Sequence, residues 1–115
     1  DVYKLQFEEI IYIEKQTILN NLNPKAQELL LNEAKMANEE IEHQNMIKYM
    51  FYELEKSKYV QKLKIYTEYA NLGTLQDFIK RKREEKGKFS EDFIWYVLIS
   101  LVDVLEYIHS KGLVH

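Results

Sequence analysis

EIIYIEKQTIL, residues 9–19, is the segment that says most about how this chain folds. β-Branched and aromatic residues dominate it, which favours a β-strand. Side chains along a strand alternate between its two faces, so Ile11, Ile13, Lys15 and Thr17 share one face. A lysine therefore stands in line with two isoleucines, on a face that the isoleucines mark as apolar.

A helix is expected from residue 24 onward. Asn23 is a good N-cap, Pro24 suits the first helical position, and residues 25–41, KAQELLLNEAKMANEEI, are strong helix formers. The predicted apolar stripe consists of Leu29, Leu30, Ala34 and Ala37. Glu33 falls in the middle of this stripe, where a carboxylate needs a partner. The residues alone leave three interpretations of Lys15 and Glu33: a functional pair, a structural ion pair, or two edge residues whose charged ends reach the solvent.

The remaining elements have clear boundaries. Residues 2–5 are expected to form a strand end, and two strands are predicted at residues 46–53 and 61–69, joined as a hairpin by LEKSKYVQ. In the second of these strands, Leu63, Ile65 and Thr67 face one way. Thr74 begins a capping-box helix that ends in a charged segment before Gly87. Strands come first and helices after, which predicts an α+β fold.

The last helix is predicted to run from Ser90, its N-cap, to Gly112, a left-handed C-cap. Its apolar residues cover more than one face: Ile94, Leu98, Ile99, Leu101, Val102, Leu105 and Ile108. Such helices are buried inside larger proteins, and 115 residues provide little interior. We therefore expect the chain to be a piece of a larger domain. We expect no membrane association, because no apolar run reaches bilayer length and the N-terminus lacks the features of a signal peptide.

Composition excludes several classes of function. A net charge of −3 gives no electrostatic case for nucleic acid, and the basic run KRKR at residues 80–83 is followed at once by two glutamates. The chain has no cysteine, which rules out disulfides and thiolate metal sites and fits a cytosolic protein. We expect no metal site. His43 and His109 are interpreted as packing and capping residues, and Asp77, Asp92 and Asp103 as surface or capping charges.

These features together resemble a protein kinase. The lysine strand, the glutamate helix, IYTEYANLGTL at residues 65–75 and YIHSKGLVH at residues 107–115 carry the resemblance, which covers the entire chain. EHQNMIKY and the final helix resemble the NimA-related serine/threonine group most. The resemblance implies an incomplete two-lobe kinase fold, with an antiparallel sheet and its αC helix followed by the start of the helical lobe. Residues 1–69 would be the amino-terminal lobe without its glycine-rich loop. Residues 70–115 would be the hinge and the first two helices of the carboxy-terminal lobe, ending at the histidine of the HRD motif, His115.

The resemblance assigns a role to ten residues around ATP. Lys15 would hold the α- and β-phosphates, and Glu33 would position Lys15. The resemblance also implies an adenine contact at Val2, a wall of the adenine pocket at Ile13, the gatekeeper at Thr67, the hinge at Glu68, Tyr69 and Ala70, the ribose position at Thr74 and the floor of the adenine pocket at Leu75. No catalytic residue is expected in this chain, because the catalytic aspartate and the Mg²⁺ ligands of kinases lie beyond His115.

Two functions remain open. The first is a fragment of an ATP-dependent protein serine/threonine kinase, inactive by itself, whose intact parent uses Mg²⁺ and transfers phosphate to a protein hydroxyl. The second is a non-catalytic pseudokinase that acts as a scaffold or interaction module. Three departures motivate the second: Ile13 stands where kinases usually have alanine, Ala37 is small for its position, and Glu33 lies one residue farther from His43 than expected. The resemblance also makes microtubule, centrosomal or ciliary partners and a cytoplasmic or cytoskeletal location plausible.

Overall fold

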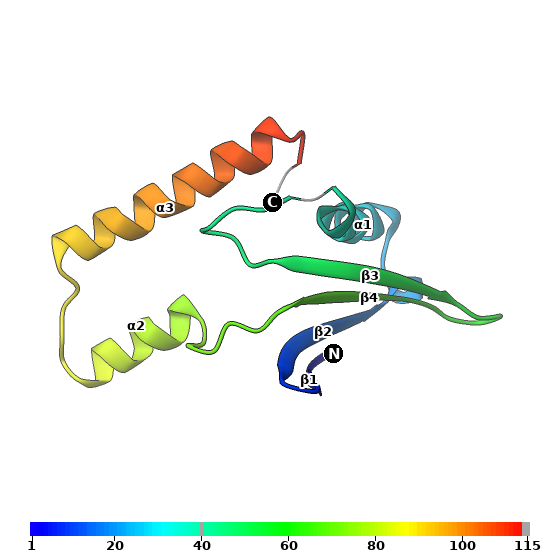
Figure 1. Cartoon of the computed structure of the whole chain (residues 1–115), viewed down its shortest axis with the longest axis horizontal. Coiled ribbons are helices and arrows are strands. Elements are labelled where there is room, and N and C mark those ends of the chain that lie inside the picture. Colours follow the sequence, from blue (N-terminus) through cyan, green and yellow to red (C-terminus); the bar gives the residue numbers. More distant parts are fainter. Residues whose placement is uncertain (40, 114–115) are drawn as a thin grey trace.

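The computed structural model describes residues 1–39 and 41–113, and the prediction for His115 lies outside these residues. Its elements confirm the α+β class (Figure 1). They are β1 (Val2–Phe7), β2 (Ile10–Ile18), the 3₁₀ turn η1 (Leu19–Asn21), α1 (Pro24–Asn38), β3 (Tyr49–Lys56), β4 (Gln61–Glu68), α2 (Leu75–Glu84) and α3 (Glu91–Ser110). The predicted domain boundary between residues 69 and 70 stays a prediction.

The four strands form one antiparallel sheet in the order β1-β2-β4-β3. In the β2–β4 ladder, Lys15 lies opposite Ile65 and Thr17 lies opposite Leu63. Directly opposed residues point to the same face of a sheet, so the alternation predicted for both strands holds. Leu63 and Ile65 are 1% and 2% exposed. They form one apolar cluster with Leu19 and with Ala34 of α1, which covers this face.

Strand β3 contains an irregularity that sequence alternation does not predict. Tyr49 lies opposite Thr67 and Phe51 lies opposite Tyr66, so Met50 is an extra residue in β3. This β-bulge places Tyr49 on the same face as Tyr52. The strand itself runs from Tyr49 to Lys56, three residues later than its predicted range of 46–53. The hairpin to β4 forms as predicted, closed by the Ser57 amide, which donates to the Val60 carbonyl at 2.8 Å.

Helix α1 begins as predicted, because the Asn23 side chain accepts a hydrogen bond from the Ala26 amide at 2.8 Å. The predicted stripe is partly wrong. Leu29 is 58% exposed, whereas Ala34 and Met36 are 1% and 4% exposed. The reason is that α1 has neighbours on two sides: Ala34 packs on the sheet, and Met36 packs in a second cluster that includes Val104 of α3. The buried face of α1 is therefore rotated relative to the predicted stripe, and Leu29 lies outside it.

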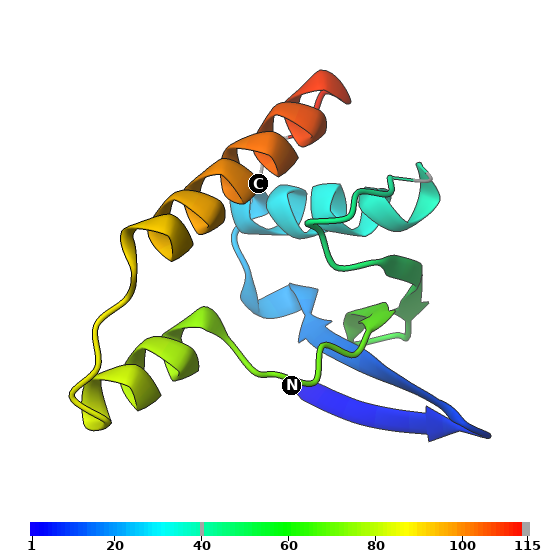
Figure 2. The same ribbon diagram turned by 60° about the vertical axis from the view of Figure 1, so that its left-hand side comes forward.

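The C-terminal end of α3 lies near α1 (Figures 1 and 2), and the second cluster joins these two helices. It contains Met36, Ile41, Val104, Ile108 and Leu113. The end of α3 is a Schellman cap: Gly112, at φ +75°, donates to the His109 carbonyl at 3.0 Å, and the Leu113 amide donates to the Ile108 carbonyl at 3.2 Å. The predicted left-handed cap is therefore confirmed.

Polar contacts fasten the loop at residues 41–48 to α3. His43 Nε2 lies 3.2 Å from Asp103 Oδ2, and the His43 ring packs on Tyr107 at 5.2 Å between centroids. The Asn45 side-chain amide donates to the Ser100 carbonyl at 3.3 Å. Asp103 is 52% exposed, so it is a surface charge as expected, and its carboxylate also pairs with His43.

Most of α3 is exposed in this chain, in line with the expectation that 115 residues provide little interior for it. Val104 and Ile108 are buried, but Ile94, Ile99 and Val102 are 56%, 62% and 57% exposed. By length and composition alone, α3 would also reach across a membrane, with a mean hydropathy of 1.4, so the statement that no apolar run has this length was wrong. Only Val104 and Ile108 of the described residues of α3 are buried, and both belong to the cluster that packs against α1.

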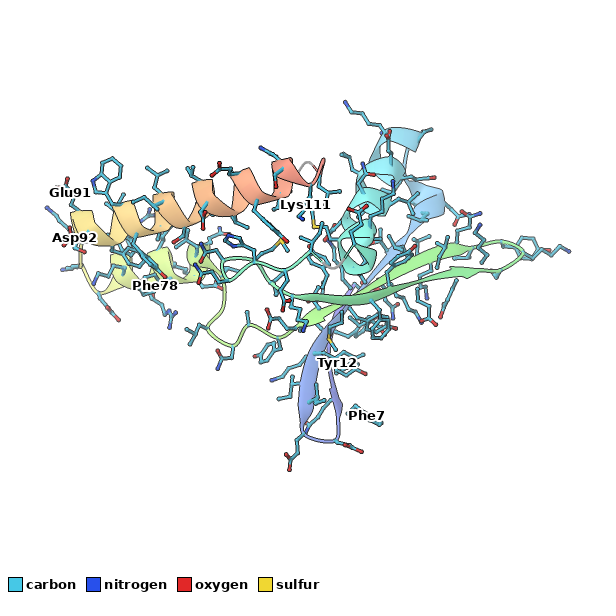
Figure 3. All side chains as sticks on the ribbon, turned by 45° about the horizontal axis from the view of Figure 1, so that its top comes forward. Phe7, Tyr12, Phe78, Glu91, Asp92 and Lys111 are labelled. Atoms are coloured by element: carbon cyan, nitrogen blue, oxygen red, sulfur yellow. The ribbon has the colours of Figure 1, made fainter. Side chains whose placement is uncertain are left out.

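The first turn of α2 packs near the start of α3. Phe78 of α2 lies beside the start of α3 (Figure 3). The centre of its ring is 5.5 Å from that of Phe89 and 5.6 Å from that of Phe93. Ser90 caps α3 as predicted, accepting from the Phe93 amide at 3.2 Å. On the other side of the molecule, the β1–β2 hairpin projects from the sheet with Phe7 at its end (Figure 3), and Phe7 is 66% exposed.

Candidate nucleotide-positioning site

The site is built around Lys15 of β2 and Glu33 of α1. The Lys15 ammonium lies 3.4 Å from each oxygen of the Glu33 carboxylate. Both side chains were expected to be buried, but they are 43% and 28% exposed, so the pair lies at the open edge of the sheet–helix interface. An ammonium in this position is held by a carboxylate and still accessible to a ligand.

Three of the other predicted residues share a sheet face with Lys15. Val2 lies opposite Lys15 in the β1–β2 ladder, and Ile13 lies opposite Thr67 in the β2–β4 ladder. Residues two apart on β2 point to the same face, so the register brings Val2, Ile13 and Thr67 to the side of the sheet that carries Lys15. Val2 is 65% exposed, which leaves an apolar surface beside the ammonium.

The predicted hinge, residues 68–70, follows directly from the end of β4. The Glu68 amide donates to the Lys48 carbonyl at 3.0 Å, and the Glu68 carboxylate accepts from the Lys48 amide at 2.7 Å. These two bonds tie the end of β4 to the loop before β3. The Lys4 ammonium lies 4.3 Å from the centre of the Tyr69 ring, which is a cation–π contact between β1 and the hinge. Ala70 is exposed.

Thr74 and Leu75 belong to the start of α2. The capping box forms as predicted: Thr74 Oγ1 accepts from the Asp77 amide at 3.1 Å, and the Thr74 amide donates to Asp77 Oδ2 at 3.0 Å. These hydrogen bonds from Thr74 lower the pKa of Asp77. Leu75 lies along an apolar groove of about 270 Å³ between α2 and α3. The structure thus gives Thr74 a capping role, and its predicted position near a ribose stays a prediction.

Tyr49 of β3 is a member of the site that sequence reasoning missed. Its hydroxyl donates to Glu33 Oε1 at 3.2 Å. Burial, followed by the charge of Glu33 and the hydrogen bond to it, raises the pKa of Tyr49 to about 12. No alternation pattern predicts this contact, because the bulge at Met50 decides which face Tyr49 occupies. The sequence signal was limited to an aromatic residue in a predicted strand.

Comparisons with known proteins bear on the whole chain. A family model described as "Protein tyrosine and serine/threonine kinase" matches residues 8–115. The chain is 29% identical over 101 residues to the "Probable serine/threonine-protein kinase nek2" of Dictyostelium discoideum, covering 88% of this chain and 23% of that protein. This similarity supports the resemblance to the NimA-related group.

Two other relatives are also named as kinases. The "Serine/threonine-protein kinase D1044.8" of Caenorhabditis elegans is 26% identical over 106 residues, covering 88% of this chain and 10% of that protein. The "Mitosis inhibitor protein kinase SWE1" of Candida albicans is 30% identical over 103 residues, covering 90% of this chain and 8% of that protein. The chain spans less than a quarter of the length of these curated relatives. A family model that covers nearly all of the chain, on a fold with the predicted sheet and αC helix, shows that this chain belongs to the protein kinase family.

Proposed function

We propose that this chain is the nucleotide-positioning part of an ATP-dependent protein serine/threonine kinase. The observation that carries the proposal is the Lys15–Glu33 pair, which lies on the same sheet face as Val2, Ile13 and Thr67. A cation held by a carboxylate next to an apolar surface fits a ligand that has a phosphate chain at one end and a planar ring at the other.

The residues of this chain fit ATP in two further respects. Lys15 is 43% exposed, so a phosphate oxygen has access to the ammonium without breaking its contact with Glu33. The Lys48 contacts hold the end of β4 in place, so the backbone groups of residues 68–70 would present a fixed edge to an adenine ring. Among residues 1–39 and 41–113, no cluster of His, Asp and Glu has the arrangement of a metal site. We therefore propose that the Mg²⁺ ligands belong to other parts of the protein.

In the proposed reaction, an acceptor hydroxyl oxygen bonds to the γ-phosphorus of ATP. The bond from that phosphorus to the β–γ bridging oxygen breaks, ADP leaves, and the hydroxyl proton passes to a base. Lys15 and Glu33 contribute orientation and charge to this step and no proton transfer. By resemblance to kinases, the base lies beyond His115, so residues 1–115 alone are expected to be inactive.

The experiment compares Lys15→Met with wild type in the full-length protein, using ATP, Mg²⁺ and a generic protein acceptor. Lys25→Met is the control, because Lys25 is an exposed lysine at the start of α1. We expect Lys15→Met to abolish phosphoryl transfer and Lys25→Met to leave it unchanged. ATP at about 100 times its Kd should also stabilise the wild-type protein by about 2.7 kcal/mol in a thermal-shift measurement. Equal activity of Lys15→Met and wild type would refute the proposed role of Lys15.

The pseudokinase alternative has less support. All three relatives above are named as kinases, and Glu33 reaches Lys15 despite its longer spacing from His43. It would regain support if the full-length protein bound its partners but showed no thermal shift with ATP and Mg²⁺.

The phosphoryl acceptor and the cellular location are further proposals. Family membership supports a protein as the phosphoryl acceptor. Association with microtubule, centrosomal or ciliary proteins and a cytoplasmic location rest on the NimA-related resemblance. Imaging of the tagged full-length protein against tubulin would test them, and an exclusively nuclear signal would contradict them.

A further inference from the structure

Tyr49 links the Lys15–Glu33 pair to both apolar clusters. Its ring packs against the cluster of Leu19, Ala34, Leu63 and Ile65 and also against the cluster of Met36, Ile41, Val104, Ile108 and Leu113. Its hydroxyl donates to Glu33 Oε1 at 3.2 Å. The ring therefore has packing neighbours on both sides, while the hydroxyl contacts the carboxylate that faces Lys15.

The Lys15–Glu33 contact is loose by itself. Both distances are 3.4 Å, and the two side chains are 43% and 28% exposed. An exposed pair of this kind adds little stability by itself, because water competes for both charges and two long side chains must be ordered. A third group that fixes the carboxylate would reduce this disorder.

The Tyr49 hydroxyl has the chemistry for this task. A pKa of about 12 means that the phenol stays protonated at physiological pH and remains a hydrogen-bond donor. Because it is neutral, it does not compete with Lys15 as a charge, and the ammonium still contacts both carboxylate oxygens. A tyrosine side chain has only two torsions, and its ring is rigid. Packing of the ring therefore fixes the hydroxyl more firmly than it would fix a lysine or glutamine head group.

We propose that Tyr49 is a positioning residue that holds the Glu33 carboxylate toward Lys15 and makes this pair depend on the packing of α3 against α1. This inference rests on the proposed function for its catalytic consequence, because the pair matters to phosphoryl transfer only if the protein binds ATP. The local part, that Tyr49 orders Glu33, is independent of catalysis. The two parts require separate measurements.

The first measurement is the rate at which a small acylating reagent labels Lys15 in the folded full-length protein, read by mass spectrometry. Tyr49→Phe keeps the ring and removes the hydroxyl. It should increase the Lys15 labelling rate by about threefold or more, because the reagent reacts with the free amine, which is more accessible when Glu33 no longer holds this nitrogen, while labelling of Lys25 in the same molecule stays constant. The matched control is Tyr12→Phe, since Tyr12 is a half-buried tyrosine on the other face of the sheet. An unchanged Lys15 rate in Tyr49→Phe would overturn the proposal.

The second measurement is steady-state kinetics of Tyr49→Phe, Glu33→Gln and the double variant. Tyr49→Phe should lower kcat/KM for ATP by about fivefold to tenfold, the effect of one lost hydrogen bond to a partly exposed charge, with KM for the protein acceptor unchanged. In the Glu33→Gln background, Tyr49→Phe should have little further effect, because Tyr49 acts through Glu33. Equal effects in both backgrounds would mean that Tyr49 only supports the core, and would overturn the proposal.

The outcomes separate the two proposals. Faster Lys15 labelling in Tyr49→Phe, in a protein whose wild type transfers no phosphate, would support the positioning role and refute the kinase activity. Normal ATP kinetics and normal Lys15 labelling in Tyr49→Phe would refute the positioning role and leave the kinase activity intact.

Discussion

Glu14 and Lys15 are neighbours in β2, and the alternation of the strand sends them to opposite faces of the sheet. Lys15 faces α1 and pairs with Glu33. Glu14 is 9% exposed on the other face, where the Gln16 side-chain amide donates to its carboxylate. The Gln16 hydrogen bond, followed by the Tyr66 hydroxyl and the charge of Lys64, lowers the pKa of Glu14 below 4.5. The sheet face opposite Lys15 thus holds a stable carboxylate that has no part in the proposed site.

The lowered pKa of Glu14 predicts how stability depends on pH. Since the folded-state pKa is lower than that of the unfolded chain, the stabilisation is present above about pH 4.5 and is lost as the pH falls through the folded-state value. Glu14→Gln removes this titration. We expect the difference in thermal midpoint between wild type and Glu14→Gln to shrink as the pH is lowered from 7 to 3. A constant difference across that range would contradict the assignment.

Residue-level prediction succeeded where the signal was local and failed where geometry intervened. Lys15 and Glu33 could be paired from the sequence, because each is a charge on an otherwise apolar face and each requires a partner. Tyr49 could not, since one extra residue in β3 changes the face on which it lies. The partner of Asp103 could not be predicted either, because His43 is far away in the sequence and meets it only through the packing of α3.

At the scale of the elements, helix starts were predictable and helix orientations were not. Asn23, Thr74 and Ser90 all accept the expected cap hydrogen bonds, because capping depends on residues within three positions. The rotation of α1 depends instead on two neighbours, the sheet and α3, that no short segment specifies. This is why Leu29 was assigned to the buried stripe although it is exposed.

The N-cap of α1 offers a test at this scale. Asn23→Ala removes the acceptor of the Ala26 amide and should destabilise the protein by about 1 kcal/mol. Asn23→Asp keeps a side-chain oxygen at the same place and should remain close to wild type. Urea denaturation of the three proteins measures the difference. If Asn23→Ala and Asn23→Asp had the same midpoint, the cap would contribute nothing to stability.

At the scale of the whole molecule, the chain is more extended than a compact domain of its size. Its radius of gyration is 16.9 Å, whereas about 13 Å is typical for this length. The sheet, α1 and the C-terminal end of α3 form a packed body, while α2 and the start of α3 contact each other mainly through the rings of Phe78, Phe89 and Phe93. The fold class was predictable from the order of the elements, but this uneven packing follows from tertiary contacts.

The exposed side of α3 predicts how the 115-residue chain behaves in solution. Apolar patches of this extent promote association, so sedimentation velocity should show oligomers whose fraction rises with concentration. Replacing Ile99 and Val102, which are 62% and 57% exposed, with lysine should reduce this association. Replacing the exposed residues Asn71 and Gln76 with lysine adds the same charge without removing apolar surface and should have little effect. Equal association in both double variants would show that charge, and not the apolar face, controls it.

The strand order has a consequence for the sequence of events in folding. The β1–β2 and β3–β4 pairs are hairpins, which close short loops, whereas the β2–β4 ladder joins segments separated by α1 and β3. Contacts of long sequence separation carry the larger entropic cost and tend to form late. Lys15 and Thr67 both lie in this ladder. A nucleotide that contacts both strands would therefore bind only to chains in which the β2–β4 ladder has already formed. Its binding free energy would stabilise this last pairing against opening.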